Sequence, residues 1–252
     1  MRYLFLISLC FVSFSLLATS EQYVVRTEVS FCKYKEGKSY DDVIKYSKKY
    51  EKFLRANGLK YSRSIFVPVI AGNTEHDYVL WGTWPDGEEM YKEYGAYLND
   101  YKNMGSKNPG ICHTNVAFFN TGALHLRIPF EEYDRVQMVE FRACKFTDNS
   151  SWSEILQLAA DNEEANIKLG RDGFGVHYLR PYRGFDANTP FDMITMTHYY
   201  NRNKRAEATK TWPKIRDYRI EHGFGERWKK NVKSCTPWDL YSMEFIYNTN
   251  DS

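Results

Sequence analysis

The chain has 252 residues, and its 34 basic side chains nearly balance its 32 acidic ones. This balance argues against a nucleic-acid-binding protein, because such surfaces normally carry a clear excess of Lys and Arg. Tyr, Phe and Trp together make up 17 % of the residues. That much aromatic area can fill a core, and it also suits a cavity for an apolar or ring-shaped ligand.

The first twenty residues predict a signal peptide, 1–20. Arg2 provides a positive start, and the apolar run that follows, 4–17, is shorter than the roughly 20 residues that a bilayer-spanning helix needs. Small residues at Ala18 and Ser20 fit cleavage after Ser20. We therefore expect an exported protein, periplasmic or secreted, with no membrane span in the mature chain.

The first half of the mature chain predicts four strands and two helices. Alternating apolar and polar residues indicate strands, and a 3.6-residue apolar period after a capping residue indicates a helix. In chain order the elements are strand 24–31, a helix from Ser39 to about Gly58, strands 61–67 and 77–84, a helix that starts at Pro85 and Asp86, and strand 112–119.

The second half repeats this order of elements. Ser151 and Glu154 form a capping box at the start of its first helix, which should stop near Gly170. The elements are strand 136–144, the helix after Ser151, strands 174–181 and 191–200, a helical region 203–231 broken near Pro213 and Gly223, and strand 238–247.

A repeat explains this order. Cys32-Lys33-Tyr34 returns as Cys144-Lys145-Phe146, and Ser39 returns as Ser151, both 112 residues later. We predict a first repeat at 21–120, a linker at 121–135 and a second repeat at 136–252. Each repeat reads βαββαβ, the ferredoxin-like unit, whose sheet has helices on one face only. The bare faces must be covered, so we expect an α+β protein in which the two units pack sheet to sheet.

The order of elements, the tandem duplication and the repeated Cys-Lys-aromatic and Trp-Pro segments resemble the dimeric α/β-barrel superfamily. Its members include antibiotic-biosynthesis-monooxygenase-like and NIPSNAP-like proteins, and this chain looks most similar to a functionally unassigned, exported branch. The resemblance implies an intrachain α/β barrel made of two fused units, and hence a monomer. It carries over no functional residues.

Four cysteines remain after the signal peptide, and an even number in an exported chain indicates disulfides. In a ferredoxin-like sheet with strand order 4-1-3-2, the first and fourth strands are antiparallel neighbours. Of the three possible pairings, this order favours Cys32–Cys112 and Cys144–Cys235.

Strand alternation separates two faces of each sheet. We expect the apolar face of the first strand, with Val29 and Phe31, to lie under the helices, and the opposite face to point into the barrel. That second face carries Glu28 in the first repeat and Glu140 and Arg142 in the second. A carboxylate inside a barrel is costly unless it is paired. Three interpretations stay open: a structural ion-pair network such as Glu140 with Arg142, a ligand-binding or catalytic carboxylate, and a register that places both glutamates outside.

Four further residues complete the candidate ligand pocket. His177 and His198 fall on adjacent strands of the second repeat, where the first repeat has Ile65 and Thr83 at the matching places. Trp81 and Trp84 lie on opposite faces of one strand, so only one of them can line an interior cavity. We expect no metal site and no cofactor.

These features support three hypotheses. The first is an exported protein that binds a small, partly apolar molecule between the two sheets. The second is a cofactor-free monooxygenase-like or isomerase-like enzyme, which the resemblance alone suggests. The third is a structural or interaction module whose barrel is filled by side chains. The sequence contains no motif that identifies a reaction.

Overall fold

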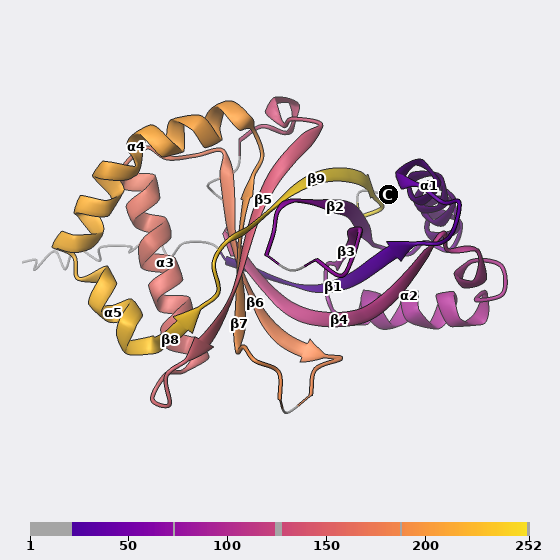
Figure 1. The fold of residues 1–252 in the computed structure, drawn as a ribbon, viewed down its shortest axis with the longest axis horizontal. Helices are drawn as coiled ribbons and strands as arrows, with labels where there is room; N and C mark the ends of the chain where they lie inside the picture. Colours follow the sequence, from indigo (N-terminus) through magenta and orange to yellow (C-terminus); the bar gives the residue numbers. More distant parts are fainter. Residues whose placement is uncertain (1–21, 73, 124–127, 187, 251–252) are drawn as a thin grey trace, which may run out of the picture.

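A computed structural model describes residues 22–72, 74–123, 128–186 and 188–250. The predicted signal peptide lies outside these ranges, as does part of the predicted linker. Within them, no helix is long and apolar enough to cross a membrane. The strands form one closed barrel, with α1 and α2 on one side and α3, α4 and α5 on the other (Figure 1).

The elements of the first half are close to the predicted ones. They are β1 (Gln22–Tyr34), α1 (Tyr40–Ala56), β2 (Ser62–Ile70), β3 (Tyr78–Trp84), α2 (Gly87–Asn99) and β4 (Gly110–Ala123). Those of the second half are β5 (Val136–Phe146), α3 (Trp152–Lys168), β6 (Phe174–Arg183), β7 (Met193–Tyr199), α4 (Arg202–Glu221), α5 (Phe224–Asn231), β8 (Val232–Cys235) and β9 (Asp239–Asn248). The sequence did not predict β8.

The strand order confirms the fold class. The sheet runs β7-β6-β4-β1-β3-β2-β9-β5-β8, and an additional β7–β5 pairing closes it into a barrel. Each half therefore has the order 4-1-3-2, read as β4-β1-β3-β2 and β9-β5-β7-β6. The halves join through the antiparallel pairs β4–β6 and β2–β9, so that no barrel strand keeps an open edge.

Local sequence signals set most helix boundaries. Ser39 with Asp42 and Ser151 with Glu154 form the predicted capping boxes of α1 and α3. Pro213 is different, because it lies inside α4 and does not end that helix. The break falls at Gly223, whose φ of 64° suits a residue without a side chain.

The barrel interior is apolar, so the predicted orientation of the sheet faces was wrong. Val29, Val139 and Trp81 point inward as part of a buried cluster. The cluster also contains Phe66, Val79, Val116, Phe118, Leu179, Met196, Tyr241 and Met243. The interior of a closed barrel excludes water more completely than the space between a sheet and its helices. Burying a charged side chain therefore costs more free energy inside the barrel. The face that carries Glu28, Glu140 and Arg142 points outward to the helices.

Both disulfides form as predicted, Cys32–Cys112 and Cys144–Cys235. The first joins neighbouring positions of β1 and β4. The second joins β5 to β8, the short strand between α5 and β9. Cys235 therefore does not sit at the start of the fourth strand of its repeat. The Cys144–Cys235 bond instead fixes the end of the helical segment that covers the second sheet.

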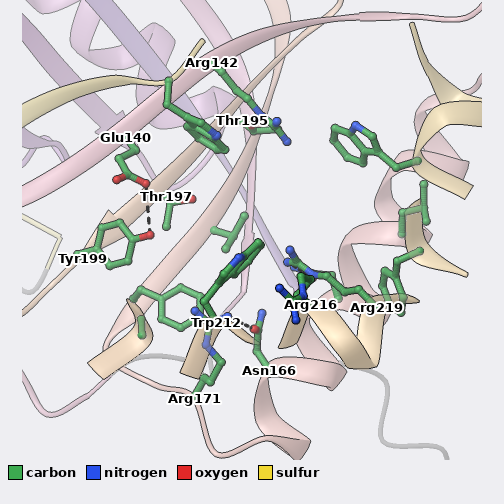
Figure 2. Close-up of a pocket in the computed structure, with 18 of the residues that line it drawn as sticks. Glu140, Arg142, Asn166, Arg171, Thr195, Thr197, Tyr199, Trp212, Arg216 and Arg219 are labelled. Atoms are coloured by element: carbon green, nitrogen blue, oxygen red, sulfur yellow. Dashed lines mark hydrogen bonds between the residues drawn. The ribbon is translucent and has the colours of Figure 1, made fainter. Parts of the chain in front are cut away.

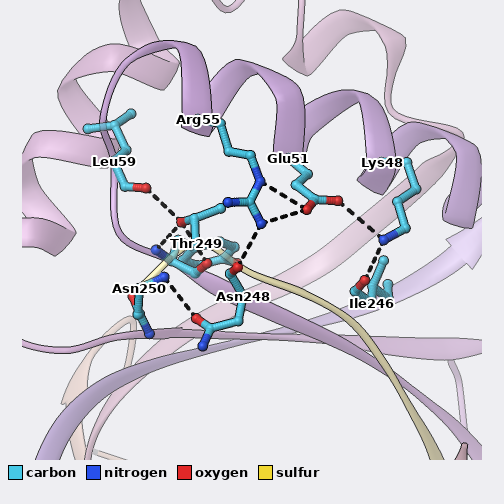
Figure 3. A network of polar contacts seen from close by, with 9 residues as sticks. Lys48, Glu51, Arg55, Leu59, Ile246, Asn248, Thr249 and Asn250 are labelled. Atoms are coloured by element: carbon cyan, nitrogen blue, oxygen red, sulfur yellow. Dashed lines mark hydrogen bonds and ion pairs between the residues drawn. The ribbon is translucent and has the colours of Figure 1, made fainter. Parts of the chain in front are cut away.

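Residues 246–249, in the last part of β9 and just after it, are tied to the first repeat. Thr249 donates a hydrogen bond to the carbonyl oxygen of Leu59 at 2.6 Å, and Arg55 donates one to that of Asn248 at 2.9 Å. Glu51 pairs with both Arg55 and Lys48, and Lys48 also reaches the carbonyl oxygen of Ile246 (Figure 3). These contacts hold β9, a strand of the second repeat, against α1 of the first.

Candidate functional site

The candidate site is a pocket of about 810 Å³ in the second repeat. Its floor is the outward face of β5, β7 and β6, and its walls come from α3, α4 and α5. It therefore lies between the sheet and the helices. The space between the two sheets, where the sequence predicted a ligand, contains the apolar cluster described above.

Three cross-strand rows make up the floor. Side chains that lie opposite each other on neighbouring strands share one face of a sheet. The rows are Arg142–Thr195–Tyr178, then Glu140–Thr197–Val176, then Tyr199–Phe174. A cation therefore lies at one end of the floor, a carboxylate in the middle and two aromatic rings at the other end.

Arginines dominate the charge of this pocket. Five lining side chains are arginines, and Glu140 is the one carboxylate among the lining residues described. Glu140 is already paired, because Arg205 of α4 lies 2.9 Å from it. Tyr199 also donates a hydrogen bond to Glu140, at 3.3 Å. This carboxylate is thus held by the protein itself.

Three of the arginines have only neutral partners. Arg142 donates to the Thr195 hydroxyl at 3.2 Å, and Arg171 donates to the Asn166 amide oxygen at 2.7 Å. Arg219 donates through Nε to the amide oxygen of Asn162 at 3.0 Å. No carboxylate pairs with these three among the residues that the structure describes.

Burial lowers the pKa of each of these three guanidinium groups. The charge of Arg219 lowers the pKa of Arg142 and Arg171 further. Arg219 therefore repels both Arg142 and Arg171 in a partly desolvated space. Such an arrangement favours the binding of an anion.

Aromatic rings hold the cations and line the rest of the cavity. The Arg142 guanidinium lies 4.4 Å from the ring centre of Trp238 and 5.2 Å from that of Trp228. Arg219 lies 5.3 Å from the ring centre of Trp212. Trp212 is 47 % exposed and Ile220 is 70 % exposed, although both line the pocket. The cavity thus presents open apolar surface beside its cations.

At the equivalent place in the first repeat, described side chains occupy the space. Gly82 pairs with Glu28 as Thr197 pairs with Glu140. Tyr61 lies across Gly82 and donates a 2.6 Å hydrogen bond to Glu28. Arg63, only 8 % exposed, occupies the position that Val176 has in the second repeat. The two repeats thus share the fold, but at this position the space between sheet and helices is filled in the first repeat and open in the second.

This packing predicts the effect of adding one methyl group. In Gly82→Ala the new Cβ would overlap the Tyr61 ring, so we expect a loss of about 1–3 kcal/mol in the free energy of unfolding. Gly95→Ala is the matched control, because this helical glycine is exposed and has nothing within 4 Å. It should be neutral or stabilising. Urea unfolding measures the free energy of unfolding of both variants. Equal values for Gly82→Ala and Gly95→Ala would contradict the close packing of Tyr61 against Gly82.

The structure separates the predicted site residues. Glu140 and Arg142 line the pocket (Figure 2). They do not form the ion pair considered from the sequence, since Glu140 pairs with Arg205 and Arg142 bonds to Thr195. Glu28 belongs to the other repeat, where it accepts hydrogen bonds from Tyr61 and Tyr94.

The two tryptophans lie on opposite faces of β3. Trp81 belongs to the barrel cluster and Trp84 to the core under α1 and α2. Neither of them lines the described pocket.

The two histidines are not part of the pocket either. His177 pairs across the strands with Met196, which points into the barrel, and His198 lies two residues farther along β7. Nδ1 of His177 is 3.2 Å from the amide oxygen of Asn120, and His198 bonds to Gln137. The register also shows that Ser64, not Ile65, matches His177. In the described ranges, no group of three or more metal-ligating side chains could hold a metal ion.

Sequence reasoning missed the helical part of the site. Arg171, Arg219 and Trp212 come from α4 and from the loop after α3, segments that were interpreted only as helix and turn. One signal was available: the second repeat replaces the single second helix of the first with a longer helical stretch rich in Trp and Arg. A longer helical segment over a sheet of the same size can leave a cavity between the helices and the sheet.

The sequence matches no family model and no curated protein. Its structure is similar to that of a protein assigned as a monooxygenase from Lactobacillus acidophilus NCFM, with a TM-score of 0.52, 12 % identity, and coverage of 90 % of this chain and 98 % of that one. It is also similar to a protein assigned as a chlorite dismutase (TM-score 0.48, 12 % identity, 90 % and 97 % coverage). A heme-binding protein from Thermus thermophilus gives a TM-score of 0.48, 12 % identity, and 90 % and 93 % coverage.

At these identities the likeness shows the fold alone, the dimeric α/β barrel. The lining residues do not fit a heme iron. The described lining includes no His, Cys or Met, and burial raises the pKa of Tyr178 and Tyr199 to about 12, so neither ring readily becomes a tyrosinate ligand.

Proposed function

We propose that this protein binds a small organic anion with a flat, apolar body in the pocket between the second sheet and its helices. The observation that carries the proposal is the set of three partly buried arginines, Arg142, Arg171 and Arg219, that face the cavity without a carboxylate partner in the described chain. Unpaired, partly buried cations are costly. An acidic ligand would offset that cost, and the tryptophans would cover its body.

The proposed ligand is of the class expected from the sequence, but its site lies between the second sheet and its helices and not between the two sheets. The predicted ligand was small and partly apolar, and the pocket adds a negative charge. Two disulfides and the predicted signal peptide support a location outside the cytoplasm. A barrel closed within one chain supports a monomer.

The other two hypotheses have less support. A monooxygenase-like or isomerase-like enzyme without a cofactor needs a general base near its substrate. The one carboxylate of the described lining is ion-paired, and no histidine is present there. The filled barrel agrees with a structural module, but such a module does not account for an open pocket with unpaired cations.

The test uses two probes of nearly the same shape. We expect biphenyl-4-carboxylate to bind and the neutral biphenyl-4-methanol to bind at least about tenfold more weakly, because only the first satisfies a buried cation. Replacing Arg142, Arg171 and Arg219 together with Gln should abolish the preference for the anion. Isothermal titration calorimetry on the purified mature protein measures these affinities.

Two controls make the result interpretable. Arg183→Gln removes an exposed arginine that does not line the pocket, and should leave binding unchanged. The triple variant should not lower the unfolding midpoint of the ligand-free protein, because it removes three partly buried cations without a carboxylate partner in the described chain, two of which Arg219 repels. A lower midpoint with intact binding would show that the three arginines serve the fold and would contradict the proposal.

A further inference from the structure

The arginines occupy different levels along the pocket. Arg142 belongs to the floor row with Thr195, whereas Arg171 lies 5.1 Å from the ring centre of Phe174, in the row with Tyr199. Thr195 and Tyr199 are four residues apart on β7, which corresponds to about 13 Å of strand. Figure 2 shows Arg142 and Arg171 at opposite sides of the pocket, with Trp212 between them.

Each end is built to hold its cation in one place. At the first end the Arg142 guanidinium is stacked against Trp228 and Trp238 and bonded to Thr195. At the second end Arg171 is bonded to Asn166 and stacked against Phe174. Since a planar guanidinium fixed in this way has N–H groups left to donate, it suits bidentate contact with a carboxylate or a similar acid.

The region between the ends has a different character. Glu140 lies in the middle row of the floor and is neutralised by Arg205. Trp212 of α4 contributes an open ring there, and Arg219 stacks on that ring. Asn162, which holds Arg219, precedes Asn166 by one turn of α3. Because the charge of Arg219 lowers the pKa of both Arg142 and Arg171, Arg219 lies near both end cations. A flat body fits this region better than a second acidic group placed beside the first.

We infer that the ligand is an elongated dianion whose acidic groups sit at opposite ends of a flat aromatic body, one bound by Arg142 and the other by Arg171. The inference rests on the proposed function and specifies its ligand class. An acid at only one end could pair with the cation there and with Arg219, which is near both ends, but would leave the cation at the far end unpaired. Two acids at the same end would leave one of them beside the ion-paired Glu140.

Three related probes test this spacing by calorimetry. Biphenyl-4,4′-dicarboxylate carries its acids at opposite ends, biphenyl-2,2′-dicarboxylate carries both near the central bond, and biphenyl-4-carboxylate carries one. We expect the 4,4′ isomer to bind at least about tenfold more tightly than the monoacid, and the 2,2′ isomer to show no such gain. Arg142→Gln and Arg171→Gln should each abolish the gain of the 4,4′ isomer and change the monoacid affinity by only a few fold.

The possible outcomes separate the two proposals. Equal affinity of the monoacid and the 4,4′ isomer would overturn the dianion and leave the anion-binding function standing. A 2,2′ isomer that binds as tightly as the 4,4′ isomer would also overturn it. If none of the three probes binds, the proposed function fails together with this inference.

Discussion

Replacing Glu93 with Gln should remove a large pH dependence from the stability of this protein. Glu93 of α2 is 3 % exposed, and Tyr50 of α1 donates a hydrogen bond to it. Burial, and then the nearby charge of Glu28, raise the pKa of Glu93 from 4.5 to about 9. At neutral pH the folded protein therefore keeps this carboxyl protonated.

The sign of the effect follows from proton binding. Between pH 4.5 and about pH 9 the folded state holds a proton on Glu93 that the unfolded state has lost. The contribution of the protonated Glu93 to the free energy of unfolding is therefore fully present below pH 4.5. It decreases as the pH rises, by up to about 1.4 kcal/mol per pH unit. Glu93→Gln cannot ionise, so between pH 6 and pH 8 the wild type should lose about 3 kcal/mol more than the variant.

Urea unfolding followed by tryptophan fluorescence at several pH values measures this difference. Glu88→Gln is the matched control, because Glu88 lies on the same helix, is 74 % exposed and pairs with Lys92. It should keep the pH dependence of the wild type. Parallel pH profiles for the wild type and Glu93→Gln would show that Glu93 is ionised in the folded protein.

The fold could be predicted from the sequence because its signals are local and occur twice. Alternation gave the strands, the residues around Ser39 and Ser151 gave the helix starts, and the repeat distance gave the two units. The Cys32–Cys112 disulfide followed, because the strand order brings these two residues together. The Cys144–Cys235 pairing was also correct, but for another reason, because Cys235 lies on β8 and not at the start of β9. Only the pattern of each element and the rule for joining them were needed.

The orientation of the sheet could not be predicted in the same way. Alternation shows that Val29 and Glu28 lie on opposite faces, but it does not say which face is more deeply buried. That depends on the closure of the barrel by β4–β6 and β2–β9 pairing, which is a property of the whole chain. Once the barrel closes, the apolar face turns inward and Glu28 faces the helices.

The site was harder to predict than the fold, because it comes from a difference between the repeats. The equivalent space in the first repeat is occupied by Tyr61 and Arg63, and the second repeat has Val176 and an open pocket. A valine such as Val176 or a glycine such as Gly82 does not by itself indicate a binding site in a sequence. Arg171 and Arg219 reach the same cavity from a loop and from a helix, and only their placement in space makes them a site.

Removing either disulfide should destabilise the protein by a similar amount, but only one of them should affect the pocket. The bonds span similar separations, 80 residues for Cys32–Cys112 and 91 for Cys144–Cys235, so each loss should lower the free energy of unfolding by about 2–5 kcal/mol. The second bond anchors β8, which directly follows α5. The segment that it holds carries Trp228 and precedes Trp238, the two rings that flank Arg142.

The pair of double variants separates stability from binding. Cys144→Ala with Cys235→Ala should weaken biphenyl-4-carboxylate binding several fold at a temperature where the protein is still folded, because the tryptophan wall loses its anchor. Cys32→Ala with Cys112→Ala should bind the probe like the wild type, since its bond lies in the other repeat. Urea unfolding and calorimetry on the same preparations provide both measurements. Equal affinities in the two variants would mean that α5 and β8 stay in place without their covalent link, held by packing and by the pairing of β8 with β5.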